Sequence, residues 1–120
     1  MPWDCALFKY LIDNVTHHVQ LTSHLPNPWR VPQEEWYAFD RNPRDGGYEI
    51  LLTIDEESYI TVGDGIVGAD TMEGEHPMAW RHNVGQGRAL YSAIGHQAAT
   101  YSIPEYREFL SRAMRWVAGE

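Results

Sequence analysis

The residue in this sequence best suited to chemistry is His96, which follows Gly95 at the end of a strand-like run. In α/β folds, a polar side chain placed after a glycine at the carboxyl end of a strand often contacts a ligand. An imidazole can give or take a proton near neutral pH, so His96 is a candidate general acid or base. The alternative is a turn whose histidine is simply exposed. The residues that could act with it are Glu35, Asp40, His76 and His82.

Two adjacent strands are expected to position His96. Residues 78–82 form the first, residues 84–87 a tight connection and residues 88–94 the second. Gly85 and Gly87 can supply positive φ at no steric cost, which suits a hairpin. Arg88, at the start of the second strand, is expected to pair with an acidic residue rather than with a ligand.

Before residue 55, the sequence predicts a short helix followed by strands and turns. Apolar residues at helical spacing predict an amphipathic helix over residues 3–15. Residues 16–22 alternate and are partly β-branched, which predicts a half-buried strand. Residues 36–40 are expected to be extended, and residues 41–47 form a turn by composition. Residues 48–54 are the most apolar β-like run, so they predict a central strand.

Acidic side chains and glycines dominate residues 55–75, which contain neither Lys nor Arg. The glycines are expected to break any regular element. The spacing of the carboxylates does not match the loop of an EF-hand, so that calcium site is excluded. A solvated loop beside a pocket, acting as a lid, fits the composition better.

The last helix is predicted over residues 103–118. Ser102 and Glu105 have the spacing of a capping box, and Pro104 falls in the first turn. Gly119 is expected to close the helix. One apolar face, expected to cover a sheet, contains Tyr106, Phe109, Leu110, Ala113, Met114 and Val117.

Length and composition limit the classes of protein that remain. The 120 residues fit one domain, and a formal charge of −8 with a single lysine argues against nucleic acid or an anionic membrane surface as a partner. No 18-residue apolar run and no signal peptide are visible, so a cytoplasmic location is expected. The single cysteine, Cys5, excludes an internal disulfide framework and a cysteine-based zinc site. We expect neither a cofactor nor a metal.

Several stretches, taken in order, resemble the trehalose-utilisation (ThuA-like) family, which is similar in fold to the class I glutamine amidotransferases. The resemblance covers about residues 16–120 and rests on residues 36–44, 50–55, 76–80 and 87–91, together with Gly95, His96 and Trp116. It implies an α/β fold of a partial flavodoxin-like kind, with a mixed sheet and covering helices in a single domain spanning 1–120. It also implies a link to carbohydrate metabolism, with disaccharides or their keto derivatives as substrates.

The resemblance also suggests roles for individual residues. By topology, His96 falls near the catalytic histidine of the amidotransferase-like enzymes, where it could act on a sugar hydroxyl or on the α-proton of a keto-sugar. Trp80, Tyr37 and Tyr91 could supply the aromatic faces that sugar-binding clefts favour, with Gly95 and Asp40 as further substrate-binding candidates. The alternative for Trp80, as for Trp36 and Trp116, is a place in the core.

The chain departs from the family pattern on its N-terminal side, because it resembles only the C-terminal half of such a domain. No Gly-x-Cys-x-Gly or Gly-x-Ser-x-Gly elbow is present, so acyl transfer by a Cys-His pair is not expected. Half of a doubly wound sheet would leave an apolar edge exposed, which predicts a homodimer. Two functions remain, namely a carbohydrate-related protein that uses His96 and a non-catalytic module that binds itself or a partner.

Overall fold

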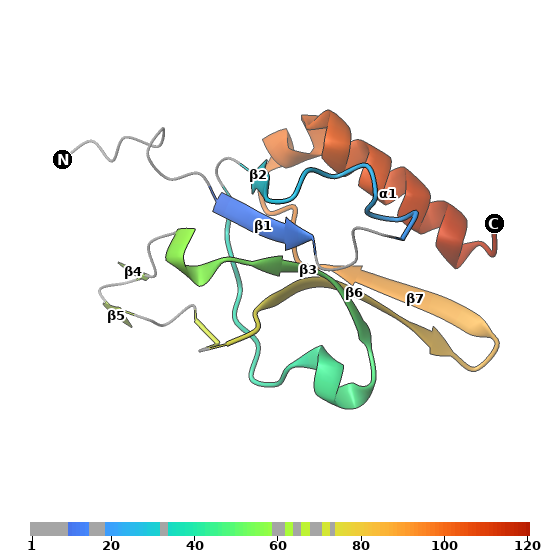
Figure 1. The fold of residues 1–120 in the computed structure, drawn as a ribbon, viewed down its shortest axis with the longest axis horizontal. Helices are drawn as coiled ribbons and strands as arrows, with labels where there is room; N and C mark the ends of the chain where they lie inside the picture. Colours follow the sequence, from blue (N-terminus) through green and yellow to red (C-terminus); the bar gives the residue numbers. More distant parts are fainter. Residues whose placement is uncertain are drawn as a thin grey trace.

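A five-stranded sheet and one long helix form the framework of the protein (Figure 1). The structure, a computed structural model, describes residues 10–14, 19–31, 34–58, 62–63, 66–67, 71–72 and 74–120. The expected α/β class and C-terminal helix are confirmed. Within the described residues, every strand pairing is antiparallel, whereas a mixed sheet was expected.

The order of strands in the large sheet places the predicted central strand in the middle. This order is β2 (Trp29–Val31), β1 (Tyr10–Asn14), β3 (Glu49–Ile54), β6 (Pro77–Val84) and β7 (Gly87–Ser92). All residues of β3 except Glu49 are buried, as expected of a strand covered on both faces. A separate pair, β4 (Val62–Gly63) and β5 (Ile66–Val67), lies outside this sheet.

The predicted hairpin of β6 and β7 is confirmed. Trp80 faces Tyr91 in its register, and Val84 faces Gly87 next to the turn. Gly85 has a φ of 58°, the left-handed conformation expected of a glycine in this turn. The same expectation for Gly87 was wrong, because that residue lies in β7 and its φ is not in the left-handed range.

The helix α1 (Pro104–Val117) agrees closely with the predicted boundaries, and Gly119 follows it with a φ of 87°. The predicted capping box was wrong. The N-cap is Ile103, which makes no side-chain cap hydrogen bond, because Ser102 belongs to the preceding 3-10 helix η3 (Ala98–Ser102). Among the described residues, no helix has the length and apolar character needed to cross a bilayer.

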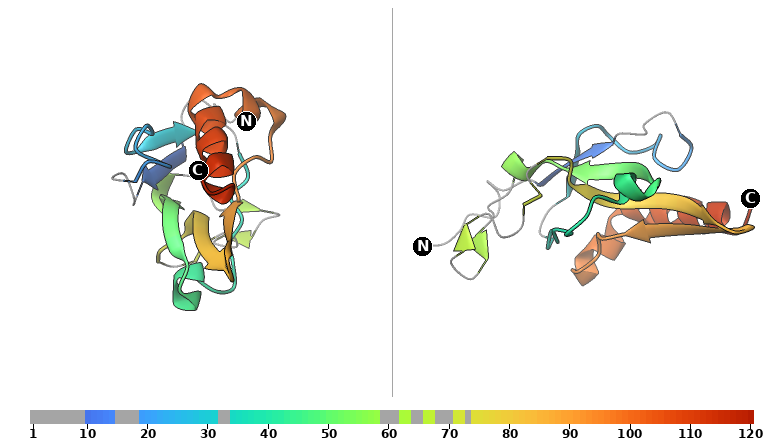
Figure 2. Two further views of the ribbon diagram at one scale, coloured as in Figure 1. Left: turned by 90° about the vertical axis from the view of Figure 1, so that its right-hand side faces the viewer. Right: turned by 90° about the horizontal axis from the view of Figure 1, so that it is seen from below.

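Helix α1 covers one face of the sheet, as the views in Figure 2 show. Its buried residues are Tyr106, Phe109 and Ala113, which join a core formed with β1, β3 and β6. Met114 is 68% exposed and Val117 is 45% exposed, so the expectation that the whole apolar face would be covered was wrong.

The two faces of the hairpin differ in what covers them. Side chains alternate along a strand, so Trp80 and Arg81 point to opposite faces of β6. Arg81 lies over the ring of Trp116, at 5.0 Å from its centroid, which places α1 on the Arg81 face. Trp80 therefore lies on the other face, where Phe39 contacts it with ring centroids 5.3 Å apart.

Three predictions for the N-terminal part and the acidic segment were wrong where the structure describes them. Residues 10–14 form the strand β1 rather than the end of a helix, because this run pairs with both β2 and β3. Residues 19–25 form turns rather than a strand, while residues 1–9 and 15–18 lie outside the described part. The acidic segment contains the 3-10 helix η2 (Glu56–Ser58) and the pair β4–β5, so it does form regular elements.

The predicted turn over residues 41–47 is confirmed. It contains the 3-10 helix η1 (Pro43–Gly46), which is closed by Gly47 with a φ of 85°. Arg44 anchors this turn, because its guanidinium donates two hydrogen bonds of 2.8 Å to the carboxylate of Glu75.

Candidate functional site

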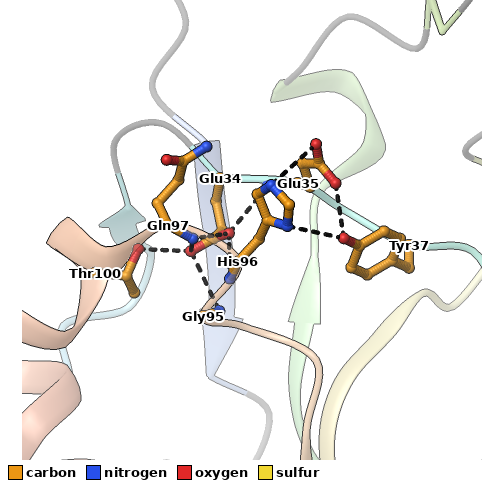
Figure 3. Close-up of polar contacts among 7 residues, drawn as sticks. All are labelled: Glu34, Glu35, Tyr37, Gly95, His96, Gln97 and Thr100. Atoms are coloured by element: carbon orange, nitrogen blue, oxygen red, sulfur yellow. Dashed lines mark hydrogen bonds and ion pairs between the residues drawn. The ribbon is translucent and has the colours of Figure 1, made fainter.

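A buried carboxylate, that of Glu34, holds the turn that carries His96 (Figure 3). The backbone N–H groups of Gly95, His96 and Gln97 donate to it at 3.2, 2.8 and 3.2 Å. The hydroxyl of Thr100 donates a further hydrogen bond of 2.5 Å. Hydrogen bonds to a charged acceptor are roughly twice as strong as those between neutral groups. Glu34 therefore fixes the backbone of the turn from a segment distant in sequence.

Contacts at the end of β7 fix the approach to this turn. Gly95 has a φ of 122°, and a Cβ at this position would collide with the side chain of Tyr101. Tyr106 of α1 donates to the carbonyl of Ile94 at 2.7 Å and contacts the hydroxyl of Ser92 at 3.1 Å. Burial raises the pKa of the Tyr106 phenol, so this donor keeps its proton. The helix thus positions the site as well as covering the sheet.

Three side chains form a triangle of polar contacts at the surface, namely Glu35, Tyr37 and His96 (Figure 3). The hydroxyl of Tyr37 donates to Glu35 at 2.7 Å and lies 3.2 Å from Nδ1 of His96. The Nε2 atom of His96 lies 3.3 Å from the other carboxylate oxygen of Glu35. The side chains of His96 and Glu35 are 43% and 51% exposed, so a solute can reach them.

The single hydrogen of the Tyr37 hydroxyl determines which ring nitrogen of His96 carries a hydrogen. Because that hydrogen goes to Glu35, the phenol oxygen can only accept from His96, so Nδ1 carries a hydrogen. Nε2 is then the nitrogen that gains or loses a proton, and it forms an ion pair with Glu35 at 3.3 Å when the ring is protonated. The hydrogen bond to Glu35 raises the pKa of Tyr37, which argues against a tyrosinate nucleophile.

Aromatic side chains lie beside this triangle on the face away from α1. Trp80 and Tyr91 are stacked with ring centroids 4.6 Å apart, and Phe39 meets both rings edge to face. Trp80 is only 9% exposed, whereas Tyr91 is 48% exposed and Tyr37 is 47% exposed. Trp80 thus has mainly a core position, and the exposed aromatic surface belongs to the two tyrosines.

The other candidate partners lie apart from the His96 ring. Asp40 lines a separate pocket together with Trp80. His82 stacks on Tyr48 with ring centroids 4.0 Å apart. His76 is buried behind the site, where Nε2 lies 2.8 Å from the carbonyl oxygen of Tyr37 and Nδ1 lies 2.9 Å from Glu56. The structure therefore brings together His96, Glu35 and Tyr37, with Tyr91 close by.

Glu34 is the residue of this candidate site that the sequence did not reveal. Its neighbour Glu35 was a candidate, but the residue types of two adjacent glutamates do not indicate which one is buried. Alternation along the segment could have indicated it, because Glu34 and Trp36 are buried while Glu35 and Tyr37 are exposed. Arg88 also differs from expectation, since it donates to the carbonyl of Trp116 at 2.8 Å and stacks on that ring.

No group of three or more His, Cys, Asp or Glu side chains within the described ranges is arranged to hold a metal ion. The triangle itself offers proton transfer by the imidazole of His96, which Tyr37 and Glu35 orient.

The chain belongs to the ThuA family, whose model is described as trehalose utilisation and matches residues 6–117. A search of curated proteins found no match. Among solved structures, the chain is similar to a ThuA-like protein from Bacteroides uniformis ATCC 8492, with 24% sequence identity and a TM-score of 0.69. The alignment covers 91% of this chain and 43% of that protein, so the chain spans less than half the length of this relative. At this identity the likeness shows the fold.

Proposed function

We propose that this protein binds a carbohydrate and that His96 acts on it as a general base and acid. The single observation that carries the proposal is the triangle of His96, Tyr37 and Glu35, in which an exposed imidazole is oriented through Nδ1 and flanked by a carboxylate at Nε2. The family description supports a sugar as the class of ligand.

In this proposal, Nε2 of His96 removes a proton from a sugar hydroxyl or from the carbon next to the carbonyl of a keto-sugar. The C–H or O–H electron pair stays on the substrate, and the proton stays on the imidazolium until it is returned. Glu35 stabilises that imidazolium, and Tyr37 keeps the ring in one orientation. The exposed ring of Tyr91 offers a surface on which the C–H edges of a sugar can stack.

The test combines binding with proton exchange. Thermal unfolding is measured with a panel of mono- and disaccharides and keto-sugars, where a ligand at 100 times its Kd adds about 2.7 kcal/mol of stability. Exchange of the keto-sugar α-proton with deuterium is then followed by NMR. His96→Ala is expected to lose the exchange while remaining folded, and His24→Gln serves as the control for loss of a histidine outside the triangle. If no sugar raises the unfolding temperature of the protein and no keto-sugar α-proton exchanges, the proposal is contradicted.

A second candidate function is a non-catalytic module that associates with a copy of itself. The observation that favours it is the apolar groove between β7 and α1, where Met114, Val117 and Tyr101 are exposed beside the last strand of the sheet. An unpaired strand edge next to apolar side chains is a surface that proteins commonly cover. Light scattering at tens of micromolar tests this candidate, with a dimer expected for the wild type and a monomer for Met114→Glu. A monomeric wild type excludes it.

A further inference from the structure

A pocket of about 570 Å³ lies on the same face of the sheet as the aromatic cluster. Its volume is within the range of small-molecule sites. Residues 39–48 and β6 enclose it, with an apolar side formed by Phe39 and Trp80 and a polar side that contains Asp40, Arg41 and Asp45. An apolar surface combined with a few charged or polar groups is the composition expected of a sugar-binding pocket.

The pocket is close to the His96 triangle. Phe39, at its edge, follows Tyr37 by two residues, so their Cα atoms are at most about 7 Å apart. Tyr91 connects the two regions, because its ring lies 6.3 Å from that of Phe39 and 4.6 Å from that of Trp80, and its phenol acts electrostatically on Tyr37. The triangle, the exposed ring of Tyr91 and the pocket therefore lie next to one another on one face of the molecule.

The polar groups of the pocket are available to a ligand. Within the part of the chain that the structure describes, the side chains of Asp40, Arg41 and Asp45 are exposed and take part in no hydrogen bond or ion pair. In contrast, the neighbouring Arg44 is bound to Glu75 and donates its backbone N–H to Asn42. The pocket thus offers two carboxylates that accept from hydroxyl groups and one guanidinium that donates.

We propose that this pocket is a second subsite, which holds an uncharged sugar ring linked to the ring that lies at His96. The inference rests on the proposed function, and it adds a specificity that the triangle does not define. The pocket is lined by two carboxylates and one guanidinium in a chain whose formal charge is −8, so a sugar acid or a sugar phosphate would be repelled. The preferred ligand is therefore a neutral disaccharide or a neutral glycoside of similar length.

The experiment is calorimetric titration of the wild-type protein with glucose, neutral glucose disaccharides, and a disaccharide that carries a glucuronate ring. We expect at least one neutral disaccharide to bind at least tenfold more tightly than glucose, and the glucuronate-containing disaccharide to bind at least tenfold more weakly than that neutral one. Asp40→Asn and Asp45→Asn should each reduce the preference for disaccharide over glucose at least threefold. Glu57→Gln, an exposed carboxylate outside the pocket, is the matched control and should change nothing.

A second measurement reports whether a sugar ring of the disaccharide occupies the pocket. The indole N–H resonance of Trp80 should shift with the disaccharide and stay unchanged with glucose, while Trp116 on the α1 side provides the internal control. Glucose and disaccharide of equal affinity would overturn the second subsite and leave the proposed function of His96 standing. If no sugar of the panel binds the wild type, both fail.

Discussion

Tyr37 lies between two histidines whose environments are opposite. His96 contacts the hydroxyl of Tyr37 and is 43% exposed, whereas His76 contacts the backbone carbonyl of the same residue and is 1% exposed. Each histidine also meets a glutamate, Glu35 in the first case and Glu56 in the second. Residue type and partners are therefore similar, and burial is the main difference.

The hydrogen bonds show what that difference means. A carbonyl oxygen only accepts, so Nε2 of His76 carries a hydrogen, and its Nδ1 lies 2.9 Å from the carboxylate of Glu56. Both nitrogens of His76 are thus occupied by protein groups in a site that solvent does not reach. Both nitrogens of His96 also meet protein groups, but its side chain is 43% exposed, so a solute can reach the ring. The buried histidine braces the segment that carries Tyr37, and the exposed one is available for chemistry.

The largest effect on stability is expected from His76→Ala. This change removes a buried side chain and leaves the Tyr37 carbonyl without that donor, and the cavity together with the unpaired group costs about 3–5 kcal/mol. Chemical denaturation measures the free energy of unfolding. His96→Ala is the matched control and should lose less than about 1 kcal/mol, as is usual for exposed contacts. Equal losses for the two variants would remove the distinction between brace and reactive group.

Glu34→Gln is expected to have the next largest effect. The amide cannot replace a charged acceptor for the three N–H groups of the turn, and hydrogen bonds to charged groups contribute about 1.5–3 kcal/mol. The unfolding free energy should fall by about 2–3 kcal/mol, and the backbone amide resonances of residues 95–97 should move. Glu35→Gln, its exposed neighbour, should leave those resonances nearly unchanged. If Glu34→Gln leaves the free energy of unfolding unchanged, the turn does not depend on the Glu34 carboxylate.

The sequence predicted the elements that local patterns specify, and it missed the features that depend on long-range contacts. The hairpin of β6 and β7, the central β3 and the helix α1 were predictable because periodicity and turn residues specify them locally. Residues 10–14 were misassigned as helix because their apolar spacing fits both structures, and only pairing with two distant strands decides for the strand. The position of His96 after a strand was also predictable, and its role stays a prediction. The role of Glu34 could not be found, because its partners become neighbours only in the folded chain.

Gly95→Ala is expected to have a smaller effect than Glu34→Gln. A side chain at this residue must adopt a φ of 122° and would collide with Tyr101, so we expect a loss of about 1–3 kcal/mol. Gly85→Ala is the control, because Gly85 has a φ of 58° with no atom near its absent Cβ. A larger loss for Gly95→Ala then reflects the more restrictive φ of 122° together with the collision, and unfolding curves of the two variants measure it. Equal losses would mean that Tyr101 moves aside and that the turn tolerates a side chain.

The smallest effect is expected from Glu75→Gln, which precedes the buried His76 by one residue but removes an exposed contact. Hydrogen bonds from Arg44 and then Asn42 lower the pKa of Glu75 from its ordinary value of 4.5. A lowered pKa stabilises the folded state above that ordinary value, and the contribution disappears as the pH falls below 4.5 through the folded-state pKa. Because Arg44 and Glu75 are 55% and 29% exposed, screening limits the contribution to about 1 kcal/mol or less. Denaturation of wild type and variant at pH 7 and pH 3 should show a small difference that becomes smaller at the lower pH. A loss as large as that of His76→Ala, or one that does not shrink at pH 3, would show that burial does not separate the strong contacts of this protein from the weak ones.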